Sequence, residues 1–321
     1  MTRTIMIACF ALVLAMEAQG QAMNDDIDAI KAPMIAAKIH QDSIDTSRLM
    51  AVYDYECKTQ DADDKIVTDK MKVCVLVGQH NTRCFPYRKF LKEMEWAEGG
   101  QRTGTKTLGL DKREYMEGYD FCSPEELPLL MAESFCFMPQ VWTNYPDGKM
   151  TVRDAIPPSI YETQENLKPI RWSLCEDTVT INGYLCKTAI CQLHGRKWTV
   201  HYSEDIPTSA GPWKLCGLPG LILEAETEGG VHRFVISEIR NVTVPIYYET
   251  NAVTMKTTEE KLIKDRIKTF GNKSYLQDSS YYITDFESID VVYIDKGILI
   301  NGICINDRPH VFQPLELNSS Q

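Results

Sequence analysis

The sequence lacks the features that mark several large functional classes. After its first 22 residues it has no run of eighteen or more apolar residues, the length that a membrane-spanning helix needs. It also has no cluster of basic residues, since 34 Lys and Arg are outnumbered by 45 Asp and Glu and the formal net charge is −11. We therefore expect no transmembrane segment beyond the first 22 residues, and neither nucleic acid nor anionic lipid headgroups as partners.

The short motifs of common hydrolases, nucleotide-binding proteins and metalloproteins are missing as well. The sequence contains no G-x-S-x-G, no H-E-x-x-H, no phosphate-binding glycine loop and no C-x-x-C. No close pairs of cysteine or histidine occur at the spacing of a structural zinc site. The sequence thus predicts neither a cofactor nor a metal, assigns no catalytic residue, and favours a protein without enzyme activity.

The first 22 residues have the pattern of a secretory signal. Arg3 supplies the positive charge of a short n-region, residues 5–16 form an apolar core, and small residues surround Gly20. The pattern predicts export, with cleavage between Gly20 and Met23 and a mature chain in the periplasm or associated with the outer envelope. An uncleaved N-terminal anchor is the alternative.

Cysteine is the next informative residue type. The chain has eleven cysteines, and one of them, Cys9, falls within the predicted signal. The other ten are Cys57, Cys74, Cys84, Cys122, Cys136, Cys175, Cys186, Cys191, Cys216 and Cys304. An even number of cysteines in an exported chain predicts disulfide bonds. We expect at least three within the chain, and the sequence does not determine their pairing.

Closely spaced turn signals predict antiparallel strands through the middle of the chain. Asn182-Gly183 and His194-Gly195 are two-residue turns that tolerate positive φ, and Glu228-Gly229-Gly230 is a longer turn. The segments between these turns have the apolar and β-branched composition of strands. Strands joined by short turns are neighbours in a sheet, so this region is predicted to be a β-meander.

Helical patterns are few and flank the predicted strands. Residues 23–50 have helix-like spacing, and residues 258–270 predict a helix that places Leu262, Ile263 and Ile267 on one side. Helices before and after a meander indicate an α+β protein. The expected fold is a strongly twisted, partly closed antiparallel β-sheet with a few flanking helices.

The segment 211–222 is the most distinctive part of the sequence. It holds three glycines and two prolines and cannot form a regular helix, so it is predicted to be a shaped loop that leads the chain into a buried strand. Its last six residues are Gly217, Leu218, Pro219, Gly220, Leu221 and Ile222. Either these glycines set a bend that packs the apolar residues into the core, or they expose backbone N–H groups to a ligand. We favour the first interpretation, because the motif has no ionisable group.

This hexapeptide gives its name to the GLPGLI family of exported bacterial proteins, and the chain resembles that family over about residues 172–241. The resemblance rests further on Trp172, the stretch 182–189, Gly195-Arg196, Tyr202, Asp205-Ile206-Pro207 and the stretch 211–214. A weaker likeness covers Val75–Gly78 and Phe85. The resemblance implies export. It implies no activity, because the family has no established chemistry.

Four residues of this region are candidates for binding or for anchoring the loop: Arg196, Tyr202, Asp205 and Trp213. The first three could converge as an ionisable cluster beside the loop, as acid–base chemistry requires. Alternatively, Arg196 and Asp205 tie the loop to the sheet by a salt bridge, which is the interpretation we favour. Trp213 could offer an aromatic surface to a ligand. His194 lies in a predicted turn and is expected to be solvated.

These patterns predict one α+β domain over residues 23–321 with a binding or accessory role in the cell envelope. The curved sheet would hold an apolar ligand or a peptide or protein partner. One alternative is a hydrolase that acts on an envelope or imported substrate through Arg196, Tyr202 and Asp205, and another is a structural partner of an outer-membrane receptor. A deep apolar groove would favour ligand binding, converging polar groups the hydrolase, and a flat exposed apolar patch the structural partner.

Overall fold

The computed structural model describes residues 41–60, 64–87, 89–90, 93–94, 139–156, 159–250, 254–270, 291–294, 297–300, 303–304 and 311–319. The predicted secretory signal lies outside the described residues. The same holds for Cys122, Cys136 and the side chain of Cys304, three of the predicted disulfide cysteines.

Strands account for nearly all of the regular structure. They are β1 (Gln41–Gln60), β2 (Ile66–Val77), β3 (Thr82–Pro86), β4 (Gln140–Thr143), β5 (Lys149–Ile156), β6 (Ser159–Asn166), β7 (Ser173–Ile181), β8 (Tyr184–Leu193), β9 (Arg196–Ser203), β10 (Leu221–Thr227), β11 (His232–Glu249), β12 (Thr254–Lys256), β13 (Val291–Ile294), β14 (Gly297–Ile300), β15 (Ile303–Cys304) and β16 (Val311–Phe312). The helical elements with defined bounds are the 3-10 turn η1 (Glu228–Gly230) and α7 (Glu259–Phe270).

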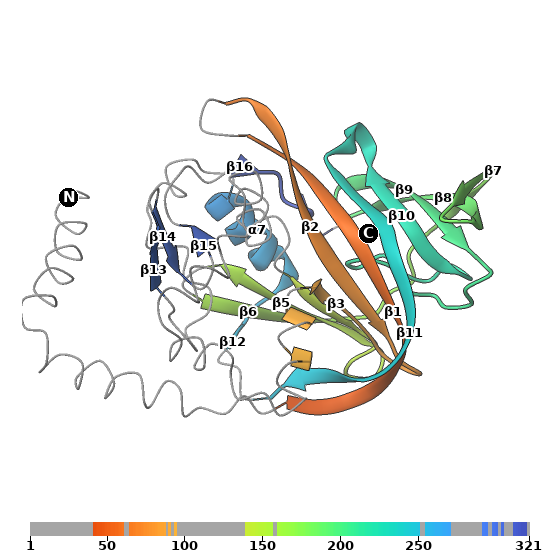
Figure 1. Ribbon diagram of the computed structural model, residues 1–321, viewed down its shortest axis with the longest axis horizontal. Helices are drawn as coiled ribbons and strands as arrows, with labels where there is room; N and C mark the ends of the chain where they lie inside the picture. The colour runs from red at the N-terminus through yellow and green to blue at the C-terminus, as the bar shows by residue number, and fades with distance from the viewer. Residues whose placement is uncertain are drawn as a thin grey trace, which may run out of the picture.

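Most strands belong to one large sheet. Its order is β12-β6-β5-β4-β3-β2-β1-β11-β10-β9-β8-β7, and β16 pairs with β1 beyond the end of β11. Strands β13, β14 and β15 form a separate small sheet. In Figure 1 the long strands β1, β2 and β11 cross the middle of the molecule, with β7–β10 on one side and β3–β6 and α7 on the other. The two halves of the sheet thus meet at the β1–β11 pair.

The predicted α+β class is wrong, and so is the predicted partial closure of the sheet. Helical backbone among the described residues is limited to α7, η1 and residues between 87 and 94. The sheet is open, because it ends in the edge strands β12 and β7, and the parallel pairing of β12 with β6 makes it mixed. The helix-like spacing predicted for residues 23–50 is wrong for residues 41–50, because these residues start β1 and pair with β11. Cross-strand pairing outweighs a weak local preference there.

Both predicted two-residue turns are confirmed. The φ angles are 50° and 85° at Asn182 and Gly183, and 50° and 79° at His194 and Gly195. Positive φ at both central residues matches the right-handed twist of the flanking strands. The turns join β7 to β8 and β8 to β9, so residues 173–203 form the predicted meander.

The predicted C-terminal helix is confirmed as α7, with one change to its packed side. The Thr258 hydroxyl accepts a hydrogen bond from the backbone N–H of Lys261 and so caps the helix start. Leu262 and Ile263 are buried as predicted, but Ile267 is 36 % exposed. Arg266 takes its place on the packed side, where it forms a buried ion pair with Asp154 of β5. Helix α7 is therefore fixed to the sheet by a charge as well as by apolar contact.

The middle of the sheet is buried on both faces. Tyr53 and Tyr55 of β1 pack in the larger core, while Met50 and Val52 of the same strand pack in a second core around Trp142. Alternate residues of a strand point to opposite faces, so this burial means that both faces of the sheet are covered there. Each such side chain contributes roughly 1.5–3 kcal/mol when it leaves water.

Candidate functional site

The loop between β9 and β10 (residues 204–220, the Gly/Pro loop) packs onto the larger core. Leu218 within the loop and Ile222 just after it are buried. A Cβ on Gly220 would lie 2.0 Å from the carbonyl oxygen of Ser203 at the end of β9. Only glycine permits this approach of two backbone segments. The geometry supports the structural interpretation of the hexapeptide.

Trp213 is buried as well and offers no aromatic surface to a ligand. Its φ angle is 54°, and its backbone N–H donates to Sγ of Cys84 at 3.0 Å. The ring centroid lies 5.5 Å from those of Trp198 and His194. Of the two roles considered for Trp213, the structure fits loop anchoring, because the ring fills the interior beneath the loop.

The predicted cluster of Arg196, Tyr202 and Asp205 does not form. Arg196 is the first residue of β9 and Asp205 lies two residues past its last, and the eight residues of the strand span roughly 26 Å at about 3.3 Å each. Arg196 instead donates to the backbone oxygens of Pro314 and Leu315 at 2.6–3.1 Å. The Tyr202 side chain is buried in the larger core, and Asp205 is exposed. Neither the hydrolytic cluster nor the Arg196–Asp205 salt bridge is present.

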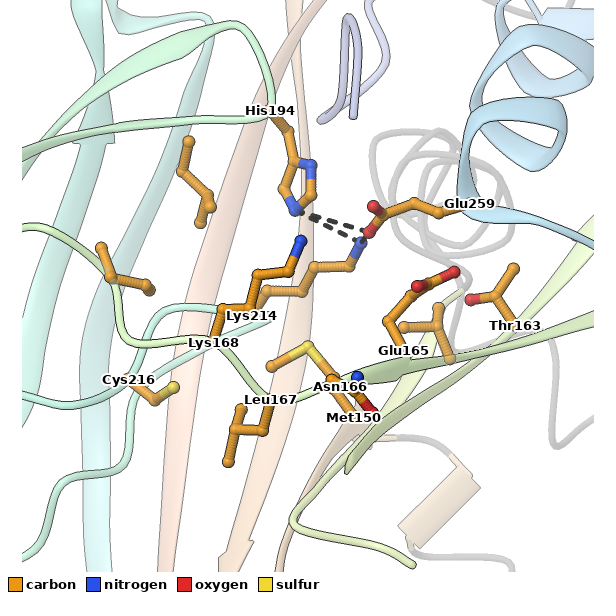
Figure 2. A pocket seen from close by; sticks show the side chains of 13 residues that line it. Met150, Thr163, Glu165, Asn166, Leu167, Lys168, His194, Lys214, Cys216 and Glu259 are labelled. Atoms are coloured by element: carbon orange, nitrogen blue, oxygen red, sulfur yellow. Dashed lines mark hydrogen bonds and ion pairs between the residues drawn. The ribbon is translucent and has the colours of Figure 1, made fainter. Parts of the chain in front are cut away.

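A different set of ionisable side chains converges on the Gly/Pro loop. The Nζ atom of Lys214 lies 2.6 Å from Oε1 of Glu259, in the first turn of α7, and 2.6 Å from Oε1 of Glu316, which follows β16. Nε2 of His194, in the β8–β9 turn, is 3.5 Å from the same Nζ and 3.7 Å from Oε1 of Glu259. Figure 2 shows His194, Lys214 and Glu259 pointing toward one another from three elements. We call these four residues the Lys214 cluster.

The environment of the Lys214 cluster favours the charged forms of Lys214 and Glu316 and the neutral form of His194. Burial lowers the pKa of Lys214, but the carboxylates of Glu316 and Glu259 outweigh burial and raise the pKa above its ordinary value. Burial raises the pKa of Glu316, and the charge and hydrogen bond of Lys214 more than reverse this effect. Burial, followed by the charge of Lys214, lowers the pKa of His194. At neutral pH the imidazole is uncharged, so a single ammonium group faces the two carboxylates.

A small cavity adjoins the Lys214 cluster. Its lining includes the polar residues Thr163, Asn166 and Lys168 and the apolar residues Met150 and Leu167, several of which Figure 2 labels. Its volume is about 30 Å³. A single water needs roughly 10–15 Å³, so the cavity admits a water or a small ion but no apolar ligand. This cavity is therefore not the deep apolar groove that would favour ligand binding.

A second group of buried charges lies beside the second core. Arg83 donates two hydrogen bonds of 2.8 Å to the carboxylate of Glu93. Arg153 donates from Nε to Glu162 at 2.7 Å and from Nη2 to the backbone oxygen of Glu249 at 2.8 Å. These bonds join β3, β5 and β6 to a neighbouring helical segment and to the end of β11. Each arginine forms a buried salt bridge with a carboxylate of the same chain, which is typical of a structural role.

Six of the predicted disulfide cysteines carry free thiols in the structure: Cys74, Cys84, Cys175, Cys186, Cys191 and Cys216. Burial raises the pKa to about 12 for Cys84 and Cys191 and to about 11 for Cys216. A thiol with such a pKa is a poor nucleophile at neutral pH, because the thiolate is scarce. Disulfide formation in the chain stays a prediction.

Strand β7 is the most exposed strand of the meander. Leu174 and Val179 of β7 are 66 % and 38 % exposed, and Leu185 of β8 is 61 % exposed. Glu176 and Asp177 lie where the register of β7 against β8 shifts. Among the described residues β7 ends the sheet and pairs only with β8, so one edge of its backbone is open to pairing there.

The Lys214 cluster is not predicted from the sequence. Lys214 belongs to the distinctive stretch 211–222, where no local pattern gives it a role, and the turn position of His194 predicts a solvated side chain. His194 is buried, and its Nδ1 contacts Asn318, which lies 124 residues further along the chain. Glu259 follows the helix cap Thr258, but an acidic residue there is common to many helices. No local pattern brings these residues together.

Comparisons with known proteins give a weak likeness of fold. No family model matches the chain, and no curated protein matches it. Two solved structures of PNGF-II, in different crystal forms, share 13 % identity with it at TM-scores of 0.40 and 0.39. They match 68 % and 77 % of this chain, which spans about a third of their own length (33 % and 36 %). Among the described residues, no helix is long and apolar enough to cross a membrane.

Proposed function

We propose that the protein is an exported GLPGLI-like envelope protein that binds a peptide or protein partner, and that an extended segment of the partner pairs with edge strand β7. The observation that carries the proposal is the open edge of β7 beside the exposed side chains of Leu174, Val179 and Leu185. Proteins usually protect such edges with proline or lysine. Strand β7 contains neither. Glu176, Asp177 and the register shift protect the middle of its edge, and the part from Thr178 onward is left regular.

The charges of β7 select the kind of partner. Asp177 is the middle residue of the strand, so symmetric antiparallel pairing of two copies would place their Asp177 carboxylates opposite each other. Like charges directly opposite destabilise a strand pair. An extended segment with basic residues near Glu176 and Asp177, and apolar residues near Val179, fits better. The net charge of −11 also favours the approach of a basic segment.

The other functions considered from the sequence receive less support. An apolar ligand would need a larger space than the cavity of about 30 Å³ beside the Lys214 cluster, and a less polar lining than that of a second hollow of about 240 Å³, which Glu56, Lys58, Thr68, Glu226, Gly230 and Arg233 line. The hydrolase would need Arg196 and Asp205 in one place, and β9 holds them apart. A structural partner of an outer-membrane receptor is one form of the partner binding proposed here.

The proposal is tested with a labelled synthetic peptide of alternating valine and lysine, compared with a valine–glutamate peptide of equal length. We expect saturable binding of the first peptide only, measured by fluorescence anisotropy, with NMR amide shifts concentrated in β7 and β8. Val179→Lys should weaken binding about tenfold. Ile66→Lys is the matched control, because it adds the same charge at a residue of β2 that is 73 % exposed.

Three results would contradict partner binding at β7. They are equal binding of the two peptides, equal loss of binding in the two lysine variants, and amide shifts that lie away from β7. A concentration-dependent dimer that Val179→Lys abolishes, measured by sedimentation, would identify a second copy of the chain as the occupant and would also overturn the proposal.

Export is tested separately. Intact mass and N-terminal sequencing of protein from an envelope fraction should give a chain that begins between residues 21 and 23. A chain that still begins at Met1 would contradict the cleaved signal and leave the β7 experiment unaffected.

A further inference from the structure

The Lys214 cluster has the donor set of a cation site. One ligand atom from each of His194, Glu259 and Glu316 can be chosen so that all three lie within 4.8 Å of one another. One imidazole nitrogen and two carboxylate oxygens suit a zinc-type ion, which binds such atoms at roughly 2.0–2.2 Å. Modest side-chain movement would therefore bring all three atoms to a single ion.

His194 is held in the orientation of a metal ligand. Its Nδ1 is 3.2 Å from the backbone oxygen of Asn318. Because a carbonyl oxygen can only accept, Nδ1 carries the hydrogen, and the lone pair of Nε2 accepts from the Lys214 ammonium group. Figure 2 shows the His194 ring directed toward Lys214 and Glu259. A backbone carbonyl that fixes the tautomer in this way is the usual second contact of a metal-bound histidine. This contact is independent of the two carboxylates.

The ammonium group of Lys214 lies where the ion would bind, within hydrogen-bond distance of both carboxylates and on the Nε2 side of His194. We propose that His194, Glu259 and Glu316 form a zinc-type divalent cation site that the chain fills with its own Lys214, so that a metal ion enters only when Lys214 is displaced or removed. The adjoining cavity of about 30 Å³ leaves room for a water as a further ligand. The proposal does not depend on partner binding at β7.

Two substitutions of Lys214 test the proposal. Lys214→Ala removes the charge and opens the space, whereas Lys214→Met removes the charge but fills the space. We expect wild-type protein to bind Zn²⁺ at least about 100-fold more weakly than Lys214→Ala, because two charge-assisted hydrogen bonds must break before the ion enters. Isothermal titration calorimetry measures the affinities. Co²⁺ added to Lys214→Ala should give the visible absorption of a low-coordinate site, which Lys214→Met should lack.

Stability supplies a second measurement. Lys214→Ala leaves two buried carboxylates without their cation, so its melting temperature should fall below the wild-type value and rise again with Zn²⁺. If the variant folds only when Zn²⁺ is present during refolding, the proposal is supported. Adding His194→Gln to Lys214→Ala should abolish both the Co²⁺ absorption and the rescue.

Each of the other outcomes would overturn the proposal. If Lys214→Ala folds neither with nor without Zn²⁺, or folds and binds none, the three side chains do not form a metal site. If wild-type protein binds Zn²⁺ as tightly as Lys214→Ala and loses it in His194→Gln, Lys214 does not occupy the site. Rescue of Lys214→Met equal to that of Lys214→Ala would show that the ion binds elsewhere.

Discussion

The Gly/Pro loop and strand β7 belong to the same stretch of the chain, residues 172–241, but differ in what surrounds them. The loop brings Leu218 and Trp213 into the larger core, and its Lys214 contacts α7 and the segment after β16. Strand β7 has one neighbouring strand and an open backbone edge. The residues of the loop motif therefore serve the fold, whereas strand β7 is better placed to accept a partner. The predictions below test this difference.

The largest effect is expected at Gly220, where the loop touches β9. Gly220→Val places a side chain 2.0 Å from the Ser203 carbonyl oxygen, so we expect a loss of about 3 kcal/mol in the free energy of unfolding. Chemical denaturation measures it. The matched control is Gly217→Ala, which has a φ of 93° but no contact nearer than 3.9 Å and should cost about 1 kcal/mol. Equal stability of Gly220→Val and wild type would contradict a structural role for the loop.

A smaller loss is expected at Arg196, where the sequence alone suggested a weak ion pair. The side chain is buried and donates to Pro314 and Leu315, so Arg196→Ala should cost about 2 kcal/mol through the unsatisfied carbonyl groups. Lys197→Ala is the control on the next residue, since its exposed ion pair with Glu228 is worth about 0–1 kcal/mol. Thermal unfolding of the two variants should separate them, and equal melting temperatures would contradict the buried contact.

The smallest effect on stability is expected at β7. Val179→Lys and Leu185→Lys change exposed side chains, so each should alter the free energy of unfolding by no more than about 0.5 kcal/mol. Thermal unfolding checks this, and the peptide experiment checks binding with the same proteins. Destabilisation as large as that of Gly220→Val would mean that β7 serves the fold, and the contrast between the two regions would be lost.

Local sequence was sufficient for the parts of the fold that local geometry decides. The turns at Asn182 and His194 follow from residues that accept positive φ, and α7 follows from the Thr258 cap and an apolar spacing. The burial of Leu218, Leu221 and Ile222 follows from the apolar residues and glycines of the hexapeptide. Each of these features depends on fewer than about twenty neighbouring residues.

Long-range features could not be obtained in the same way. The parallel pairing of Thr254–Lys256 with β6 depends on how the chain returns across the sheet, and a three-residue strand gives little signal. The Lys214 cluster needs four separate elements to meet. The expected Arg196–Asp205 salt bridge joins residues that are close in sequence. An extended strand places residues several positions apart far from each other in space, so the two side chains do not meet.

The pairing of β1 with β11 also has a consequence for how the chain folds. Ser237 of β11 donates a hydrogen bond to the backbone of Val52 across 185 residues, and the two strands pair from Gln41 to Cys57. Contacts between such distant segments require the closure of a large loop and slow the folding of a domain. Strand β1 gains its first β11 partner at residue 232 and its last at residue 249. The centre of the sheet is therefore expected to form late, after the local hairpins of residues 173–203.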